Sequence, residues 1–249
     1  MVDQQQLWDA HAAQSYDTPG EGMFSPEVLG PTVEVLNELA ARGRAVEFAI
    51  GTGRVAIPLA ESGVAVSGIE LSQAMVARLR EKVGEDRIPV VLGDMATASA
   101  GTGFALAYLV FNTISNLLTQ EEQVECFKNA ARHLRPGGCF VIELWVPQLR
   151  ALPLGHGGTV EVSEPGYILV DTVDVLQQRV VSHHFHFEAD VDGGRQAEVF
   201  RTPHRYIWPS ELDLMARLAG FHLESRWADW NRGPFTAESH SHVSVYRLG

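Results

Sequence analysis

An acid and two glycines that lie close together form the segment of this chain best suited to hold a ligand. Glu47 lies in an apolar run that stops at Gly51 and Gly53, and the residues from Arg54 onward have a helical pattern. A strand, a tight glycine turn and a helix N-terminus together make a nucleotide-type binding crevice. Because glycine lets the backbone approach a ligand where a Cβ atom would clash, we expect a side chain at either glycine to obstruct the ligand or to strain the backbone.

Further acids and a second glycine turn follow in a regular order. Glu70 ends a second apolar run, 17 residues after Gly53, and a carboxylate at that point can accept hydrogen bonds from both hydroxyls of a ribose. Asp94 lies in the segment Leu92–Met95, after a third apolar run. The segment Arg135–Gly138 then forms a turn before the apolar run 139–143.

This ordered set resembles the class I S-adenosylmethionine (SAM) methyltransferases, over residues 45–145. The pattern E/D-x-x-x-G-x-G, which begins here at Glu47, is similar to motif I of that family. The resemblance implies that Glu47 lies near the methionyl ammonium or holds the glycine loop, and that Glu70 binds the ribose. It also implies that Asp94 accepts from the adenine amine and that Met95 covers the ring. The cofactor-binding residues implied in this way are Tyr16, Glu47, Ala49, Gly51, Thr52, Gly53, Arg54, Glu70, Leu71, Met75, Asp94, Met95, Val110 and Phe111.

The resemblance predicts an enzyme that transfers a methyl group from SAM to a small-molecule acceptor by in-line displacement. Such an enzyme must align the nucleophile with the methyl group and exclude water. Two alternatives remain open. Residues 51–56 also fit the G-x-G-x-x-G/A fingerprint of an NAD(P)-dependent oxidoreductase on a Rossmann-type fold, although Glu47 and the segment Leu92–Met95 favour a methyltransferase. The second alternative is a non-catalytic SAM-binding protein.

Composition limits the partners. The 249 residues are 45% hydrophobic and carry a net charge of −12, without a run of Lys and Arg, so a globular domain is expected and nucleic acid is not an expected partner. Cys126 and Cys139 lie in apolar segments and are expected to be reduced and buried. The N-terminus lacks the features of a signal peptide, and no apolar run is long enough to cross a membrane. We therefore expect a cytoplasmic enzyme without a membrane partner.

Strands and helices alternate up to Trp145, which predicts a parallel sheet covered on both faces. Later runs rich in Val, Phe and His predict an antiparallel sheet. The predicted fold class is α/β: a Rossmann-like, seven-stranded methyltransferase fold with an antiparallel β insertion after the fifth strand. Within a single domain, 1–249, the expected parts are an N-terminal lid and helix (1–43), the SAM-binding core (44–150), the insertion (155–208) and the return to the core sheet (209–249).

Local signals predict where several elements begin and end. Ser25 and Ser210 are expected to be N-caps, and Thr119 is expected to open a capping box with Glu122. Gly43 is expected to end the first long helix. The fifth strand of the core is expected to begin at Cys139, directly after the second glycine turn.

Residues near the carboxyl ends of the predicted strands are candidates to contact the acceptor, because ligands gather there in α/β sheets. Asn112 follows the fourth strand and Trp145 the fifth; a polar loop and a core aromatic are the alternatives for them. Tyr16 and Trp8 lie in the N-terminal segment, which in similar methyltransferases covers the cofactor as a lid. Tyr16 is a candidate catalytic residue near the methionine portion, with a core-anchoring aromatic as the alternative for both.

Histidines are concentrated in the predicted insertion. His186 and His204 are candidate catalytic bases that face the acceptor pocket, with structural or solvated histidines as the alternative. A metal site is not expected. A two-residue turn at Asp192-Gly193 would place His184 opposite Arg201 and His183 opposite Thr202. The insertion is expected either to roof the acceptor site or to form a homodimer interface through exposed strands.

Overall fold

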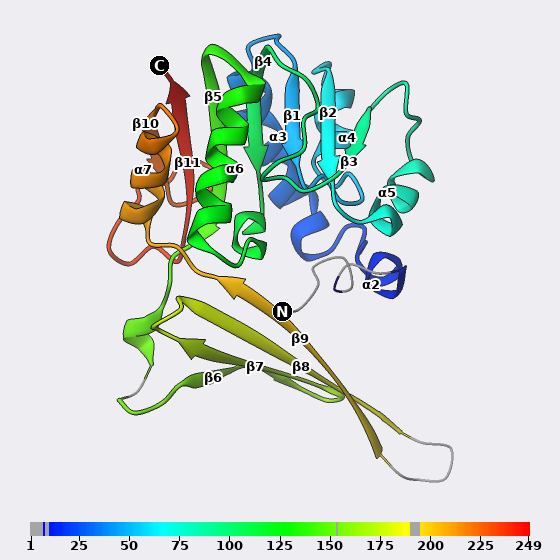
Figure 1. Cartoon of the computed structure of the whole chain (residues 1–249). Coiled ribbons are helices and arrows are strands. Elements are labelled where there is room, and N and C mark those ends of the chain that lie inside the picture. Colours follow the sequence, from blue (N-terminus) through cyan, green and yellow to red (C-terminus); the bar gives the residue numbers. More distant parts are fainter. Residues whose placement is uncertain (1–6, 8–9, 153, 190–194) are drawn as a thin grey trace.

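Two β-sheets make up the framework of the molecule (Figure 1). The computed structural model describes residues 7, 10–152, 154–189 and 195–249. The larger sheet has seven strands in the order β10-β11-β5-β4-β1-β2-β3, with only β11 antiparallel to its neighbours. Its strands are β1 (Ala45–Phe48), β2 (Val66–Glu70), β3 (Val90–Leu92), β4 (Phe104–Leu109), β5 (Leu134–Trp145), β10 (Phe221–Trp227) and β11 (Ser241–Leu248). The predicted α/β fold class is confirmed.

Helices cover both faces of this sheet (Figure 1). The main ones are α3 (Pro26–Ala40), α4 (Ala56–Glu61), α5 (Gln73–Arg80), α6 (Gln120–His133) and α7 (Pro209–Leu218), and the short α2 (Ala10–Ser15) precedes them. One buried apolar cluster joins the sheet to α6 and α7, and a second joins it to α3, α4 and α5. The strands β1 and β4 are buried along their whole length, as expected where helices cover a parallel sheet on both sides. None of the described helices combines the length and apolar character that a membrane crossing needs.

Side-chain caps fix some helix ends and not others. The hydroxyl of Ser72 accepts from the amide of Met75 at the start of α5, and Thr119 and Glu122 form the expected capping box of α6. Ser25 is the N-cap of α3 but makes no side-chain cap bond. The N-cap of α7 is Trp208, with a proline next to it, so the prediction of a serine cap at Ser210 was wrong. Proline suits the first helical position because its missing N–H is not needed there.

Two expected boundaries of the core also need correction. The residue that ends α3 is Ala41, which has a left-handed backbone. Gly43 lies in the following turn, where a Cβ atom would come within 2.4 Å of the Cβ of Ala105. Gly43 is therefore required for close packing. The strand β5 begins at Leu134 rather than at Cys139, because Leu134 already pairs with Phe104 before an irregularity in the ladder.

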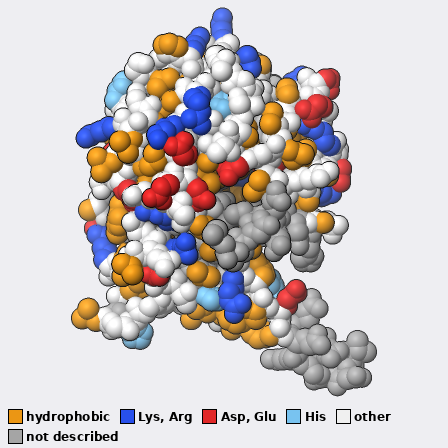
Figure 2. All heavy atoms as spheres, viewed as in Figure 1, with side chains coloured by type: hydrophobic (Ala, Val, Ile, Leu, Met, Phe, Trp, Pro, Cys, Tyr) orange, Lys and Arg blue, Asp and Glu red, His pale blue; other side chains and the backbone are white. Residues whose placement is uncertain are grey.

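The insertion is a separate four-stranded antiparallel sheet beyond the carboxyl edge of the core strands (Figure 1). Its strands, in the order β6-β7-β8-β9, are β6 (Gly158–Glu164), β7 (Tyr167–Asp174), β8 (Arg179–Ala189) and β9 (Arg195–Arg205). The chain enters it after β5 and leaves it for α7, as predicted. Figure 2 shows apolar side chains, with a few basic and histidine side chains among them, on this part of the surface.

The register of the insertion differs by one residue from the expected one. His183 lies opposite Arg201, and His184 lies opposite Phe200. A shift of one residue changes every cross-strand pair, because side chains alternate between the two faces of a strand. The turn at Asp192-Gly193, from which the expected register came, lies outside the described residues, as does Trp8.

Candidate active site

The carboxyl ends of the parallel strands meet at one edge and surround a hollow. Phe48 at the end of β1 pairs with Ile69, and Glu70 at the end of β2 pairs with Leu92. The hollow is small and opens to solvent. It is lined by Tyr16, Glu47, Ala49, Ile50, Gly51, Arg54, Val110, Phe111 and Thr113. Seven of these nine residues had been predicted to bind the cofactor.

The two glycines of the first turn have different surroundings. Gly51 has a φ of +57°, and a Cβ atom there would meet no atom within 4 Å, so its backbone faces open space. Gly53 has a φ of +82°, but a Cβ atom there would lie 2.3 Å from a methyl group of Leu79. The backbone at Gly51 is thus open to a ligand, whereas Gly53 is required for packing against α5. We had expected both glycines to serve the ligand.

Glu47 is a buried carboxyl group at the base of the hollow. It is only 3% exposed, and the hydroxyl of Tyr108 in β4 donates a hydrogen bond to its Oε2 over 3.0 Å. Burial raises the pKa of Glu47 to about 8, against an ordinary value of 4.5, although the hydrogen bond from Tyr108 and the charge of Arg54 oppose that rise. Glu47 therefore carries a proton at neutral pH in the protein without a ligand.

Glu70 joins the glycine turn to the start of α5. Its Oε2 accepts from the amide of Gly51 over 2.8 Å, and its Oε1 accepts from the amide of Ser72 over 2.7 Å. Burial raises the pKa of Glu70, and these backbone hydrogen bonds oppose the rise. A carboxylate has about four lone-pair sites, so these bonds leave some acceptor capacity at Glu70, although its side chain is buried and does not line the hollow.

The N-terminal segment closes the hollow from one side. Thr52 donates to Asp17 over 2.6 Å, and Asp17 forms an ion pair over 2.8 Å with Lys82, which lies in the turn after α5. These contacts bring Tyr16 to the hollow, where burial raises the pKa of its hydroxyl. Tyr16 therefore stays protonated at neutral pH and can donate a hydrogen bond.

Arg54 supplies positive charge to the hollow without a carboxylate partner among the described residues. Its Nη1 donates to the carbonyl of Met23 over 3.0 Å. Its guanidinium lies 5.9 Å from the ring centre of Phe24 and 5.3 Å from that of Phe111. Planar guanidinium groups bind carboxylates through two parallel hydrogen bonds, so Arg54 is suited to an anionic ligand group.

The loop after β4 has an uncommon backbone that β5 holds in place. Phe111 and Asn112 have φ values of +53° and +63°, which are costly for residues other than glycine. The amide of Phe111 donates to Oε2 of Glu143 over 2.7 Å, and the side-chain oxygen of Asn112 accepts from the amide of Trp145 over 2.7 Å. This arrangement leaves the ring of Phe111 45% exposed at the hollow.

The other predicted cofactor residues lie at the same edge but outside this hollow. Asp94 is half-buried, and its Oδ1 accepts from the amide of Ala96 over 2.7 Å. Met75 and Met95 are buried, and Leu71 is half-buried. Their positions follow the ends of β2 and β3, so their predicted contacts with ribose and adenine stay predictions.

The candidate acceptor residues are not assembled into the hollow. The ring of Trp145 lies 6.4 Å from that of Tyr206, and the amide oxygen of Asn112 is already bonded to the backbone. His186 is exposed and lies 4.8 Å from the ring of Tyr167. His204 is half-buried, and burial lowers its pKa. Neither histidine lines the hollow, so their catalytic roles stay predictions.

Besides Ile50, which lines the hollow, three residues of the site were missed in the sequence. Tyr108 bonds to Glu47, Glu143 holds Phe111, and Thr113 lines the hollow. Glu143 had a usable signal, since it is an acid near the end of an apolar strand, as Glu47 is. Tyr108 had a weaker one, a single polar group in the run 104–109. Among the described residues, no three side chains of the types His, Cys, Asp and Glu converge as metal ligands would.

Comparison with known proteins points to one family. Residues 45–138 match the family described as methyltransferase domain. The solved structure of the CcbJ methyltransferase from Streptomyces caelestis has a TM-score of 0.77 and 36% identity, and the match covers 88% of each chain. The cypemycin N-terminal methyltransferase of a Streptomyces species is 26% identical over 250 residues, which is 96% of both chains.

A third relative matches about half of this chain. The dTDP-3-amino-3,6-dideoxy-alpha-D-glucopyranose N,N-dimethyltransferase of Streptomyces fradiae is 32% identical over 130 residues, 52% of this chain and 45% of its own length. All three comparisons are with methyltransferases, and none is with an oxidoreductase.

The two glycines provide a test of the hollow. We expect Gly53→Ala to lower the free energy of unfolding by about 1–3 kcal/mol more than Gly51→Ala, because only the first change overpacks the core. Both changes also strain a left-handed backbone, by about 1–2 kcal/mol each. Urea denaturation of the two variants measures the difference, and equal losses would show that Gly53 does not face Leu79.

A second test uses the raised pKa of Glu47. Between pH 4.5 and about 8 the folded protein keeps the proton that the unfolded chain has lost. The contribution of Glu47 to the free energy of unfolding is therefore fully present below pH 4.5, and it is lost as the pH rises through about 8. Urea denaturation from pH 5 to 8.5 should show that Glu47→Gln removes at least about 1.4 kcal/mol of this decline, the equivalent of one pKa unit. The exposed Glu61→Gln in α4 is the control, and parallel curves for all three proteins would contradict the assignment.

Proposed function

Because this chain belongs to the class I SAM-dependent methyltransferases, we propose that it transfers the methyl group to the amine nitrogen of a small molecule. The observation that carries the proposal is the hollow at the carboxyl edge, which brings Glu47, Gly51 and Arg54 together with Phe111. The alternative of a nicotinamide-dependent oxidoreductase has no support from the comparisons, since the glycine turn lies within the matched methyltransferase domain.

The residues at the edge fit SAM. Gly51 leaves open space where a Cβ atom would stand, and Arg54 has the charge that a methionyl carboxylate requires. Glu47 would accept from the methionyl ammonium, and Glu70 would accept from the ribose with the lone pairs that Gly51 and Ser72 leave free. When bound, SAM supplies a methyl group on a sulfonium, which makes that carbon an electrophile.

The amine acceptor is inferred from what related methyltransferases act on. One relative that matches 96% of the chain is named an N-terminal methyltransferase, and others are named for amino sugars linked to dTDP. The chain itself is acidic, with a net charge of −12. A field of that sign attracts a cationic amine rather than a free phosphate.

An amine that arrives protonated must lose a proton before it can attack carbon. The hydroxyl of Tyr16 is protonated at neutral pH, because burial raises its pKa. It can therefore donate a hydrogen bond that orients the acceptor, but it does not serve as the base. His204 is the candidate base for that proton; burial lowers its pKa, which keeps the ring neutral and also makes it a weaker base than an exposed histidine. Phe111, Trp145 and Tyr206 supply apolar surface that excludes water from this side of the molecule.

Cofactor identity is tested by thermal and chemical stability. S-adenosylhomocysteine at 100 times its dissociation constant should stabilise the protein by about 2.7 kcal/mol, and NAD should not. Glu70→Ala should weaken binding by roughly 1.5–3 kcal/mol for each lost charge-assisted hydrogen bond, whereas the exposed Glu61→Ala should leave it unchanged. Equal affinity of the folded Glu70→Ala variant by calorimetry would remove the ribose assignment.

Acceptor class is tested by mass spectrometry with SAM and matched pairs of compounds. One pair is dTDP-3-amino-3,6-dideoxyglucose and its 3-hydroxy analogue, and the other is a short peptide with a free N-terminus and its acetylated form. We expect a mass gain of one methyl group on at least one amine and none on its blocked partner. Methylation of the hydroxyl analogue at the same rate would contradict an amine acceptor.

A further inference from the structure

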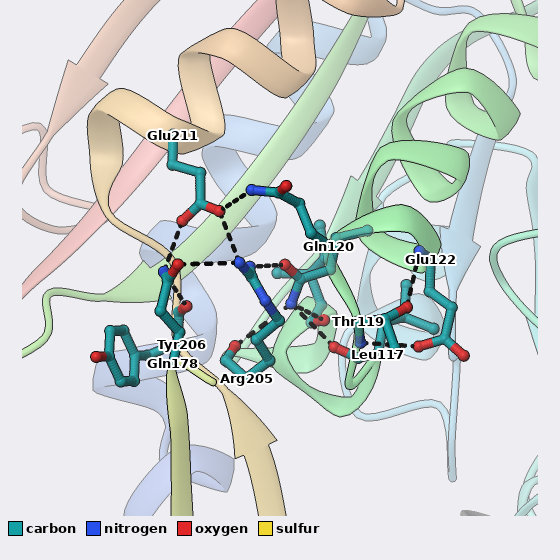
Figure 3. A network of polar contacts seen from close by, with 10 residues as sticks. Leu117, Thr119, Gln120, Glu122, Gln178, Arg205, Tyr206 and Glu211 are labelled. Carbon is teal, nitrogen blue, oxygen red and sulfur yellow. Dashed lines mark hydrogen bonds and ion pairs between the residues drawn. The ribbon is translucent and has the colours of Figure 1, made fainter. Parts of the chain in front are cut away.

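An ion pair between a buried arginine and a half-buried glutamate joins the insertion to the core of the molecule (Figure 3). Arg205, the last residue of β9, is 5% exposed, and its Nη2 lies 2.7 Å from Oε1 of Glu211 in α7. The same guanidinium donates to Gln123 of α6 over 2.6 Å and to Gln178, between β7 and β8, over 3.1 Å. Three parts of the chain that are distant in the sequence, around residues 123, 178 and 205–211, therefore meet at one arginine.

The carboxylate of Glu211 is fully engaged by this junction. Besides Arg205, it accepts from Gln120 over 2.6 Å and from Gln178 over 2.8 Å. Burial alone would raise the pKa of Glu211, but the hydrogen bonds from these three side chains lower it. Both charges are thus present at neutral pH. A buried pair of this kind fixes a geometry more effectively than it adds stability, since the cost of removing both charges from water offsets much of their attraction.

The junction also reaches the loop at the active site. The side-chain amide of Gln123, which is fully buried, donates to the carbonyl of Leu117 over 2.9 Å and to that of Ile114 over 3.4 Å. These carbonyls belong to the loop 110–117, whose first part lines the hollow. One glutamine side chain therefore connects Arg205 with the loop after β4.

The two ends of that loop are held by different contacts. The first end is fixed by Glu143, which accepts from the amide of Phe111. The second end is fixed by Gln123 and, through it, by Arg205. None of the junction residues lines the hollow, and of the segment 113–117 only Thr113 does, so a change in the junction can move the second end of the loop and the insertion while most of the surface of the hollow is kept.

We propose that Arg205, Glu211 and Gln123 are positioning residues for the methyl acceptor, which hold the insertion and the loop segment 113–117 in one mutual arrangement. This inference rests on the proposed function, because it assigns the acceptor to the side of the site between the insertion and that loop. The junction does not bind the cofactor. It sets where the acceptor nitrogen lies, and misplacement of about 1 Å can lower the rate of a reaction about 100-fold.

The helix α7 offers a matched control for the test. Asp213, two residues after Glu211, forms an ion pair with Arg226 over 2.5 Å and accepts from the hydroxyl of Tyr246 over 2.8 Å. This second pair joins α7 to β10 and β11 and makes no contact with the insertion. Glu211→Gln and Asp213→Asn each remove one negative charge from the same helix without changing the shape of the side chain.

The experiment compares the two variants by hydrogen exchange, by S-adenosylhomocysteine binding and by acceptor kinetics. For Glu211→Gln we expect at least about tenfold faster exchange of the amides in 113–117 and 200–205, and a dissociation constant for S-adenosylhomocysteine within about threefold of wild type. With the amine that wild type methylates fastest, kcat/KM should fall roughly 10–100-fold. Asp213→Asn should lower the melting temperature and change none of these quantities.

A second variant keeps the inference testable if Glu211→Gln does not fold. Gln123→Met retains the ion pair but removes the donor to Leu117 and Ile114, and we expect the same faster exchange in 113–117. Normal S-adenosylhomocysteine binding with unchanged exchange would overturn the positioning role, as would identical behaviour of Glu211→Gln and Asp213→Asn. Failure of the wild-type protein to bind S-adenosylhomocysteine would instead contradict the proposed function.

Discussion

Buried carboxylates at the ends of strands are the interaction on which this site depends. A crevice at the edge of a parallel sheet leaves backbone N–H groups without strand partners, and an unpaired buried donor is costly. Glu70 accepts from Gly51 and Ser72, and Glu143 accepts from Phe111. Each acid thus holds a turn whose backbone lies in a left-handed conformation. The turns could not keep their shape without these acceptors, and their shape leaves the hollow open.

The burial and hydrogen bonding of these carboxyl groups affect how the site binds a ligand. Glu47 is buried against Tyr108 and carries a proton at neutral pH, so a cation that binds it must displace that proton. Glu70 already gives part of its acceptor capacity to the backbone, which fixes its orientation before any ligand binds. Preorganised groups of this kind lose little freedom on binding. This preorganisation destabilises the folded protein, because Ala49 and Phe111 have strained backbones and because the acids are removed from water.

The sequence was sufficient for the architecture because each element has a strong periodic or turn signal. The order of strands and helices, the glycine turn and the acids of β1 and β2 are all local features, and the seven-stranded sheet and its insertion are confirmed. The predictions that were wrong or missing concern residues whose roles depend on neighbours that are close in space but distant in sequence. Whether Gly53 serves a ligand or Leu79 depends on how α5 packs. The partner of Glu47 is Tyr108, on a strand 61 residues away in sequence, and a strand buried on both faces shows no alternation that would indicate which way a side chain points.

In the insertion too, the features set by local sequence were predictable and those set by distant contacts were not. Its strands were predictable from composition, yet its register was one residue off, because a hairpin loop longer or shorter by one residue shifts every pair. Its attachment to the core rests on Arg205 and on glutamines in α6 and in the β7–β8 turn, none of which has a sequence signal that distinguishes it from a surface residue. The glycine turn therefore has a recognisable local sequence, whereas the attachment of the insertion rests on long-range polar contacts. Because those contacts can change without rebuilding the glycine turn, the proposed placement of the acceptor beside the insertion would allow acceptor specificity to vary independently of the glycine turn.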